Sequence, residues 1–416
     1  MSAPTLREAS RVFTRIGLMS FGGPAAQIAV MHRELVEQRP WMSEQQFLNA
    51  LSFCMLLPGP EAMQLATYAG WRLHGVRGGL IAGLLFVVPG ALVVLALSLG
   101  YALYGQVPFV EALFTGIKAA VVVIVIEALL RVAKKALKGW QHWAIAALSF
   151  VGIFVFALPF PVIILLAGLY GFFTGGADIG SAAPLPTNAT PLRTILIWLG
   201  LWWAPVAIFW AVGATFLTQI GVFFAKLAVV TFGGAYAVLA YMTQAAVSDH
   251  NWLSTAQMMD GLGLAETTPG PLILVTEFVG FLAGYGTGGI ALGILAALLT
   301  LWVTFVPCFL WIFTGAPYIE WISSRPRLTG ALSAITAAVV GVILNLSLWF
   351  ALHVFFAKVT PVKTGPATWL LADVSTLDWQ VVVLAVVSGI LILRLHMDVL
   401  RVLVLVALGG LGLSYF

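Results

Sequence analysis

Charged side chains are scarce in this sequence: Asp, Glu, Lys and Arg make up 9% of its 416 residues, whereas hydrophobic side chains make up 61%. A soluble domain carries about 25% charged residues, so the composition excludes an ordinary soluble protein. Uncharged stretches, most of them long enough to cross a bilayer, lie within 79–104, 142–157, 192–217, 289–315, 328–352 and 399–416. The sequence therefore predicts an all-α polytopic membrane protein whose first partner is the lipid bilayer.

Cysteine is also sparse, because the chain contains only Cys54 and Cys308, far apart in apolar sequence. We interpret both as buried thiols that behave as small hydrophobic side chains, without a disulfide or a metal site. The net charge of +4 is small and reflects positive loops that hold the topology. The sequence shows no nucleic-acid patch, catalytic triad, nucleotide-binding loop, or flavin or haem signature. We therefore expect no cofactor, no nucleic acid and no enzymatic activity.

The chain repeats itself when it is shifted by 211 positions. Phe21-Gly22-Gly23 then falls on Phe232-Gly233-Gly234, and Pro58-Gly59-Pro60 falls on Pro269-Gly270-Pro271. Met31, Trp41 and Ser43 match Met242, Trp252 and Ser254 in the same register, without a gap. Compositional bias aligns scattered Gly or Ala but not these residues together, so we infer a duplication. The predicted division is a repeat at 1–174, a linker at 175–192, and a second repeat at 193–416 that a linking helix at 193–217 precedes.

The positive charges of the loops indicate how the two repeats are oriented. The loop after the first Pro-Gly-Pro helix holds Arg72, His74 and Arg77, whereas its counterpart at 284–289 holds no positive charge. The next pair of loops reverses this bias, since 104–108 is bare and 316–327 includes Arg325 and Arg327. By the positive-inside rule the halves are inverted repeats, with broken or re-entrant helices and about 10 to 13 membrane segments. A parallel duplication is the alternative and would need comparable charge in matching loops.

Each half contains two helix breaks, an aromatic-Gly-Gly and a Pro-Gly-Pro. Pro24, Pro60 and Pro271 suit the first position of a helix, where unpaired amide hydrogens and the helix dipole favour an oxyanion. We therefore expect several helix N-termini to converge on an anion near the bilayer midplane; simple kinks are the alternative. The predicted binding residues are Phe21, Gly22, Gly23, Pro24, Pro58, Gly59, Pro60, Phe232, Gly233, Gly234, Thr267, Thr268, Pro269, Gly270 and Pro271, together with Lys118.

Lys118 lies about ten residues into a predicted span, where a lysine is functional by default. It either attracts the substrate or belongs to a structural ion pair. Glu127 is the candidate partner for such a pair, although a spacing of nine residues does not place two side chains on the same face of a helix. Arg15 and Lys226 occupy matching places before the two aromatic-Gly-Gly breaks, where they either support the electrostatic field or reach the membrane interface.

Three acids, Glu61, Glu266 and Glu127, are candidates for proton coupling. Glu61 has a second interpretation, since a carboxylate also stabilises the N-terminus of the helix on which it lies. Glu277 lies beside the second Pro-Gly-Pro break, without an assigned role.

These motifs resemble the chromate ion transporter family in its long, two-half form. The matching segments are "FGGPAAQIAVMHRELV", "LLPGPEAMQLATYAGWRLHG" and "GGLIAGLLFVVPG" in the first half, and "TFGGAYAVLAYMTQAAV", "GLGLAETTPGPLILVTEFVGF", "LWVTFVPCFLWIFTGAPYIE" and "ITAAVVGVILNL" in the second. The resemblance covers most of residues 10–350. It implies a carrier of the cell inner membrane that exports chromate, a tetrahedral dianion, and confers chromate resistance.

Moving two negative charges out of the cell, down an inside-negative potential of about 150 mV, releases roughly 7 kcal/mol. The membrane potential therefore suffices to drive export, and proton coupling is optional. A sulfate-type oxyanion importer, an intramembrane enzyme such as a chromate reductase, and a membrane scaffold are the other readings. The sequence leaves the oligomeric state open, with a homodimer as one option.

Overall fold

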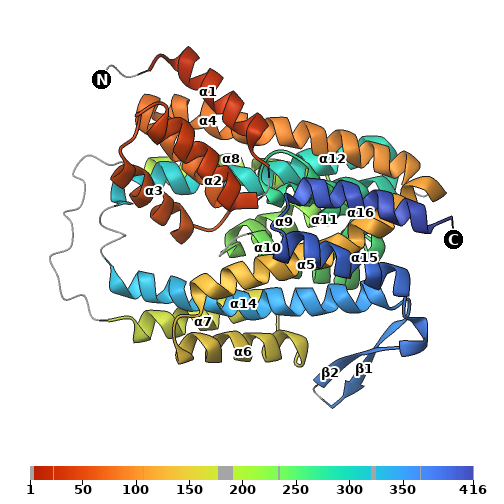
Figure 1. The fold of residues 1–416 in the computed structure, drawn as a ribbon. Coiled ribbons are helices and arrows are strands. Elements are labelled where there is room, and N and C mark those ends of the chain that lie inside the picture. The colour runs from red at the N-terminus through yellow and green to blue at the C-terminus, as the bar shows by residue number, and fades with distance from the viewer. Residues whose placement is uncertain are drawn as a thin grey trace. The chain divides into compact units, whose positions relative to one another are not determined.

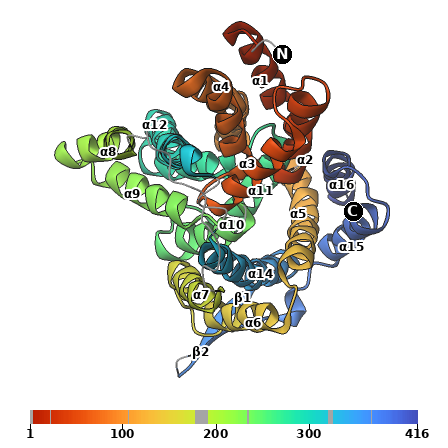
Figure 2. The same ribbon diagram turned by 90° about the vertical axis from the view of Figure 1, so that its left-hand side faces the viewer.

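The computed structural model describes residues 4–21, 23–105, 107–176, 191–232, 235–319, 325–365 and 367–415. Helices dominate the fold (Figures 1 and 2). The chain forms two compact units, one of residues 1–99, 177–235 and 268–329 and the other of residues 100–176, 236–267 and 330–416. Each unit contains parts of both sequence halves, so the units are not the repeats. Most of the expected linker, residues 177–190, lies outside the described residues, and the predicted domain boundaries stay predictions.

The first unit contains the two Pro-Gly-Pro breaks and the helices that surround them. Its elements are α1 (Leu6–Met19), α2 (Gly23–His32), the π-helical turn η1 (Arg33–Glu37), α3 (Glu44–Leu56), α4 (Glu61–Tyr104), α8 (Pro191–Ala211), α9 (Thr215–Val230), the 3-10 turn η3 (Leu272–Leu274), α12 (Val275–Gly315) and η4 (Ala316–Tyr318). The end of α4, from Gly100, belongs to the second unit.

The second unit contains α5 (Pro108–Ala136), α6 (Trp140–Phe154), α7 (Phe160–Thr174), α10 (Ala235–Gln244) from its second residue, η2 (Ala245–Asp249), α11 (Thr255–Thr267), α14 (Pro326–Phe355) from Gly330, η5 (Val374–Thr376), α15 (Trp379–Gly389), η6 (Ile390–Arg394) and α16 (Val399–Leu413). Its core is formed where α5 packs against α15 and α16, through Ala120, Ile124, Leu384 and Val402.

A short β-hairpin between α14 and α15 is an addition that the sequence analysis does not foresee (Figure 1). Strands β1 (Val359–Thr364) and β2 (Ala367–Ala372) pair antiparallel, from Val359 opposite Ala372 to Thr364 opposite Ala367. Gly365 adopts a φ of 62° at the turn, which suits glycine. Val359, Thr360 and Val362 before the turn, and Thr368 and Trp369 after it, are residues that favour strand. The protein remains a helical one, with this single extension of two strands among the described residues.

Five helices among the described residues are long and apolar enough to cross a membrane, at 61–104, 108–136, 191–211, 272–318 and 326–355. Shorter apolar helices lie at 140–154, 160–174, 215–230, 379–394 and 399–413. This pattern confirms the prediction of an all-α, multi-pass membrane protein.

The two longest helices are each folded back into a hairpin. The backbone of α4 leaves helical geometry at His74 and Gly75, and that of α12 leaves it at Gly288 and Gly289. Gly75 and Gly289 have φ values of 60° and 77°, which allow the sharp reversal. Small residues bring the legs together: a Cβ added to Gly70 would lie 2.3 Å from the carbonyl oxygen of Gly78.

The hairpins of α4 and α12 point in opposite directions within the first unit. The second legs of the two hairpins pack antiparallel, because Gly79 meets the side chain of Phe313 and Gly83 meets that of Phe309. The turn of α4 at 74–75 therefore lies beside the end of α12 that is opposite to its own turn at 288–289. This is the arrangement that inverted repeats produce, and it confirms the inverted-repeat prediction.

Local structure repeats with the same shift of 211 residues. Helices α3 and α11 are both 13 residues long. Each begins with reciprocal hydrogen bonds of a capping box, between Ser43 and Gln46 in the first half and between Ser254 and Gln257 in the second. Helices α2 and α10 both end in a five-residue π-helical turn. The duplication therefore extends to caps and helix irregularities.

The opposite directions of the hairpins predict opposite accessibility of their turns. A cysteine at Val76, which is 49% exposed, should react with an impermeant thiol reagent only from the cytoplasm. A cysteine at Gly286, where added side-chain atoms meet open space, should react only from outside. Cys54 and Cys308 are fully buried and give little background. Labelling of both introduced cysteines from the same side would contradict the inverted arrangement.

Candidate functional site

The Pro-Gly-Pro loops of the two halves are held in place by a pair of crossed hydrogen bonds. The amide N–H of Gly59 donates to the carbonyl oxygen of Thr231 at 2.8 Å, and that of Gly270 donates to the carbonyl oxygen of Ser20 at 2.7 Å. Ser20 and Thr231 are equivalent in the repeat, and each directly precedes an aromatic-Gly-Gly break. All four residues belong to the first unit. Each half of the sequence therefore supplies the carbonyl group that accepts the glycine hydrogen bond of the other half's Pro-Gly-Pro loop.

Two buried glutamines support the same loops. The side-chain Nε2 of Gln27 donates to the carbonyl oxygen of Gly270 at 2.7 Å, and that of Gln64 donates to the carbonyl oxygen of Pro58 at 2.7 Å. Gln27 is 1% exposed and Gln64 is fully buried. The Oε1 atoms of both side chains have no hydrogen-bond partner among the described residues. The glutamines thus fix the loops through one end of the amide group only.

Glycine is required in both loops for conformational and steric reasons. Gly59 and Gly270 have φ values of 116° and 92°, which other residues rarely adopt. A Cβ on Gly270 would lie 2.9 Å from the Leu274 side chain, and one on Gly90 would lie 2.2 Å from the carbonyl oxygen of Pro269. A larger side chain at Gly270 would thus disturb the loop itself. The predicted direct contact of these glycines with an anion stays a prediction, since their own amides already donate to carbonyls.

The helix N-termini that follow the breaks converge on one small cavity of the first unit. Its lining comes from the start of α2 (Pro24 and Gln27), the start of α4 (Pro60, Glu61 and Ala62), the turn η3 (Pro271, Leu272 and Ile273), and Thr231 and Ala235 at the remaining break. The cavity measures about 20 Å³ and has room for about one water molecule. Sequence analysis predicted this convergence of Pro24, Pro60 and Pro271, and the structure places all three around the cavity.

Backbone amides at the start of α4 and at η3 supply the donors for such a site. The first bond of α4 runs from the amide of Gln64 to the carbonyl of Pro60, and that of η3 runs from the amide of Leu274 to the carbonyl of Pro271. The amides of Ala62 and Ile273 precede these bonds, so they have no carbonyl partner within their helices. Together with the helix dipoles, they favour negative charge in the cavity.

Glu61 brings a carboxylate to this cavity. A negative charge stabilises the N-terminus of α4, where Glu61 is the first residue. The same charge repels an anion that binds beside it. The role of Glu61 in proton coupling stays a prediction, and its position beside the amides is compatible with that role.

Lys118 lies in the second unit and is paired with an acid that the sequence analysis did not select. Its Nζ is 3.2 Å from Oδ1 of Asp260 on α11, and Oδ2 of Asp260 accepts a hydrogen bond from the hydroxyl of Tyr101 at 2.7 Å. Asp260 is 4% exposed. The geometry favours the structural ion pair, because the carboxylate compensates the positive charge. Lys118 also lines a cavity of about 400 Å³ with Thr115, Thr255, Ala256, Met259, His353 and Asp378 among others.

The acids Glu127 and Glu266 lie together in a second polar group of the same unit. Glu127 pairs with Arg131, one helical turn later, at 2.5 Å. Glu266 accepts a hydrogen bond from the hydroxyl of Tyr236 at 2.7 Å, and it is close enough to Arg131 and Glu127 to interact electrostatically. This group contains two carboxyl groups, one guanidinium and one phenol. When one of the two carboxyl groups takes up a proton, the positive charge of the guanidinium is balanced by the other, as the coupling hypothesis requires.

The other predicted residues have varied surroundings. Arg15 lies 3.5 Å from the buried carboxylate of Glu34, which also pairs with Arg39, so its charge serves a structural pair. Lys226 is exposed.

The remaining predicted residues lie at the breaks themselves. The hydroxyl of Thr267 donates to the carbonyl of Leu264. Thr268 is buried, and Phe21 is 41% exposed. Phe232 directly follows Thr231 of the crossed bonds, and Gly23 begins α2. Gly22, Gly233 and Gly234 lie outside the described residues.

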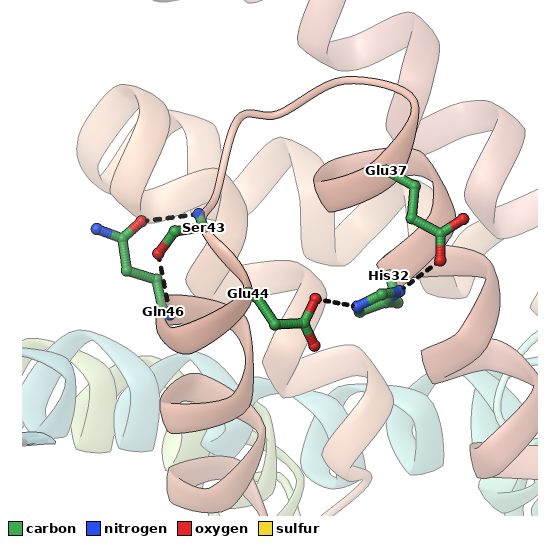
Figure 3. Close-up of polar contacts among 5 residues, drawn as sticks. All are labelled: His32, Glu37, Ser43, Glu44 and Gln46. Carbon is green, nitrogen blue, oxygen red and sulfur yellow. Dashed lines mark hydrogen bonds and ion pairs between the residues drawn. The ribbon is translucent and has the colours of Figure 1, made fainter.

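Near the start of α3, His32 lies between two acids of the first unit (Figure 3). Its Nδ1 is 3.1 Å from Glu37 and its Nε2 is 2.7 Å from Glu44. These contacts connect the end of α2 and the turn η1 with the start of α3, next to the capping box of Ser43 and Gln46. They fix the connection between two of the short helices that bear the breaks.

Sequence reasoning missed Gln27, Gln64 and Asp260. A signal was present for each, because a glutamine or aspartate inside an apolar helix must find a partner. Glu277, named beside the break but without a role, is 1% exposed, and neither carboxyl oxygen has a hydrogen-bond partner among the described residues. The crossed bonds of Ser20 and Thr231 use backbone carbonyls, so side-chain identity carried no signal for them.

The sequence model of the chromate transporter family matches residues 7–172 and 218–413 of this chain. The chain belongs to the chromate transporter family. Its relatives include a chromate transport protein of Cupriavidus metallidurans, 30% identical over 82% of this chain and 81% of that protein. A chromate transport protein of Pseudomonas aeruginosa is 33% identical over 80% of this chain and 77% of that protein. No solved structure shows significant similarity to the chain.

In this member of the chromate transporter family, variants of Lys118 and Asp260 test whether Lys118 has a structural role or binds the substrate. Removal of one partner leaves a poorly solvated charge, so Lys118→Met and Asp260→Asn should each destabilise the protein by about 3–5 kcal/mol. The double variant should recover most of this loss, as followed by thermal unfolding in detergent. If the double variant is stable but chromate transport is absent, Lys118 serves the substrate. If the double variant recovers both stability and transport, the role of Lys118 is structural.

Proposed function

We propose that this protein exports chromate from the cytoplasm and that the cavity of the first unit is its oxyanion site. The observation that carries the proposal is the convergence of three helix N-termini, those that follow Pro24, Pro60 and Pro271, on one cavity. The names of the relatives, chromate transport proteins, support chromate as the substrate.

The chemistry of the site follows from its donors. The amides of Ala62 and Ile273, which have no carbonyl partner within their own helices, can donate hydrogen bonds to the oxygens of a tetrahedral anion, and the helix dipoles compensate its charge. The cavity now has room for about one water molecule, so anion binding requires it to widen. Inverted-repeat carriers supply such a change when one group of helices moves against another around a central site.

The direction of transport is argued from energetics. Export of a dianion down an inside-negative potential of about 150 mV releases roughly 7 kcal/mol, which supports about five decades of concentration ratio. An importer would have to overcome the same free energy with coupled ions. The protein therefore works as an exporter in the cell inner membrane, and export lowers the chromate load of the cytoplasm and confers resistance.

Proton coupling, where it occurs, is assigned to the group of Glu127, Arg131, Tyr236 and Glu266. These side chains lie outside the lining of the oxyanion cavity. Glu266→Gln keeps the shape and the acceptor oxygen for Tyr236 but removes the titratable group. The variant therefore separates potential-driven transport from transport driven by a proton gradient.

Chromate flux in proteoliposomes tests this function. We expect the protein to move chromate toward the positive side when a membrane potential is imposed, and to do so without a pH gradient. In the Glu266→Gln variant, potential-driven flux should persist while any acceleration by a pH gradient disappears. Chromate flux that ignores the potential, or labelled sulfate accumulation against it, would contradict an exporter and favour an ion-coupled importer.

A further inference from the structure

Helices α6 and α7 form a hairpin in the second unit, and both lie beside the first half of α14 (Figures 1 and 2). Near the start of α6, Nε2 of His142 is 3.0 Å from the Oγ of Ser333. Near the end of α7, a Cβ added to Gly171 would lie 2.3 Å from the carbonyl oxygen of Gly330. The start of α6 and the end of α7 therefore lie together, beside the start of α14.

A groove of about 330 Å³ runs between the two helices of this hairpin, and its volume is in the range of small-ligand sites. The described residues that line it come from α6, α7 and the turn between them. Gly152, Leu158 and Ile163 make its end near that turn apolar. Leu148 and Leu166 line it farther along and are 72% and 56% exposed. The groove therefore opens to the surface of the chain.

The other end of the groove is polar and aromatic. Trp140 and Gln141 line it from the first turn of α6, and Tyr170 lines it from the second half of α7. Trp140 is 77% exposed and Tyr170 is 43% exposed. Tryptophan and tyrosine are enriched where the hydrocarbon of a membrane meets its headgroups. The groove thus leads from an apolar end to an end that suits the membrane interface.

The length of the hairpin places the groove within one leaflet of the membrane. Helices α6 and α7 have 15 residues each, so each is about 22 Å long. The hydrocarbon core of a bilayer is about 30 Å thick. When Trp140 lies at the interface, the turn at 155–159 therefore lies within the hydrocarbon, and the groove lies at the depth of acyl chains.

Basic side chains lie at the interfacial end of the groove. Lys134 belongs to the last turn of α5 and Lys138 precedes Trp140 by two residues, and both lysines are exposed. The packing of Ala136 with Ala146 brings the end of α5 beside α6. No acidic residue occurs at 128–174 in the sequence. By the positive-inside rule this end faces the cytoplasm, whose leaflet carries anionic headgroups.

We propose that the groove between α6 and α7 binds one anionic phospholipid of the cytoplasmic leaflet. An acyl chain lies along the groove, and the phosphate lies beside Lys134 and Lys138. The chain matches the apolar end of the groove, and the negative headgroup matches the lysines at its interfacial end. A zwitterionic lipid offers the same chain but no net charge, so charge distinguishes this site from the general contact of the protein with lipid. The inference does not depend on the substrate that is transported.

Native mass spectrometry of the purified full-length protein in mild detergent tests the inference. The protein is titrated with dioleoyl-phosphatidylglycerol and, separately, with dioleoyl-phosphatidylcholine, which has the same acyl chains. We expect the first phosphatidylglycerol to bind about thirtyfold more tightly, since each of two lysines contributes about fivefold. Equal affinities for the two lipids would overturn the inference.

A pair of lysine variants tests the position of the headgroup. Lys134→Gln combined with Lys138→Gln should lower the affinity for phosphatidylglycerol to that for phosphatidylcholine. Lys358→Gln combined with Lys363→Gln is the matched control, because these exposed lysines follow the other end of α14, a helix of 30 residues and about 45 Å. The control should keep the preference. An equal loss in the two double variants would overturn the assignment.

Two variants that fill the groove test the position of the acyl chain. Ala144→Phe and Leu166→Trp each add bulk to the lining, from α6 and α7 respectively. Each should weaken the first phosphatidylglycerol at least about tenfold. Ala147→Phe adds the same bulk at an exposed position of α6 outside the lining, and it should have no effect.

Two outcomes with the groove-filling variants would overturn the inference. Tight binding of phosphatidylglycerol that persists in both variants would mean that the lysines hold a headgroup without the groove. A lipid-free dimer that both variants disrupt would assign the groove to a second copy of the chain.

Discussion

The structure depends on one constraint: inside a bilayer every backbone N–H and C=O group needs a partner within the protein. The Pro-Gly-Pro loops interrupt the helices that would otherwise meet this constraint, because two of their residues have no amide hydrogen and the glycine between them has a positive φ. Their glycine amides are satisfied across the repeat by the carbonyls of Thr231 and Ser20, and carbonyls of the same loops are satisfied by Gln64 and Gln27. The amides of Ala62 and Ile273 have no carbonyl partner within their own helices, and both residues line the cavity.

This solution makes the two halves mutually dependent. Neither loop is complete without the other half, so the duplication creates the site as well as enlarging the protein. The halves have nevertheless diverged at the places where chemistry enters. Gln27 corresponds to Val238 and Gln64 to Val275 under the shift of 211 residues, and Glu61 corresponds to Leu272. The backbone framework is symmetric, whereas these three polar side chains of the first half have apolar counterparts in the second half.

The sequence allowed the main features of the fold to be predicted, because Trp41, Ser43 and both Pro-Gly-Pro motifs fix the repeat and its register. Loop charge at Arg72 and Arg77 indicated the inverted orientation that the hairpins of α4 and α12 display. The partner of Lys118 was not predictable from spacing, since Asp260 is 142 positions away and the two meet only through the packing of α11 on α5. The crossed hydrogen bonds were not predictable because they join backbone atoms. The β-hairpin was not predicted because the sequence pattern around it indicates helices.

The most direct test of the account is the position of chromium in a structure of the protein with chromate, located by its anomalous scattering. The account predicts one main signal in the first unit, within hydrogen-bonding reach of the amides of Ala62 and Ile273 and of the side chain of Gln27. A signal confined to the cavity beside Lys118 in the second unit would contradict it, because the helix N-termini would then serve the fold alone.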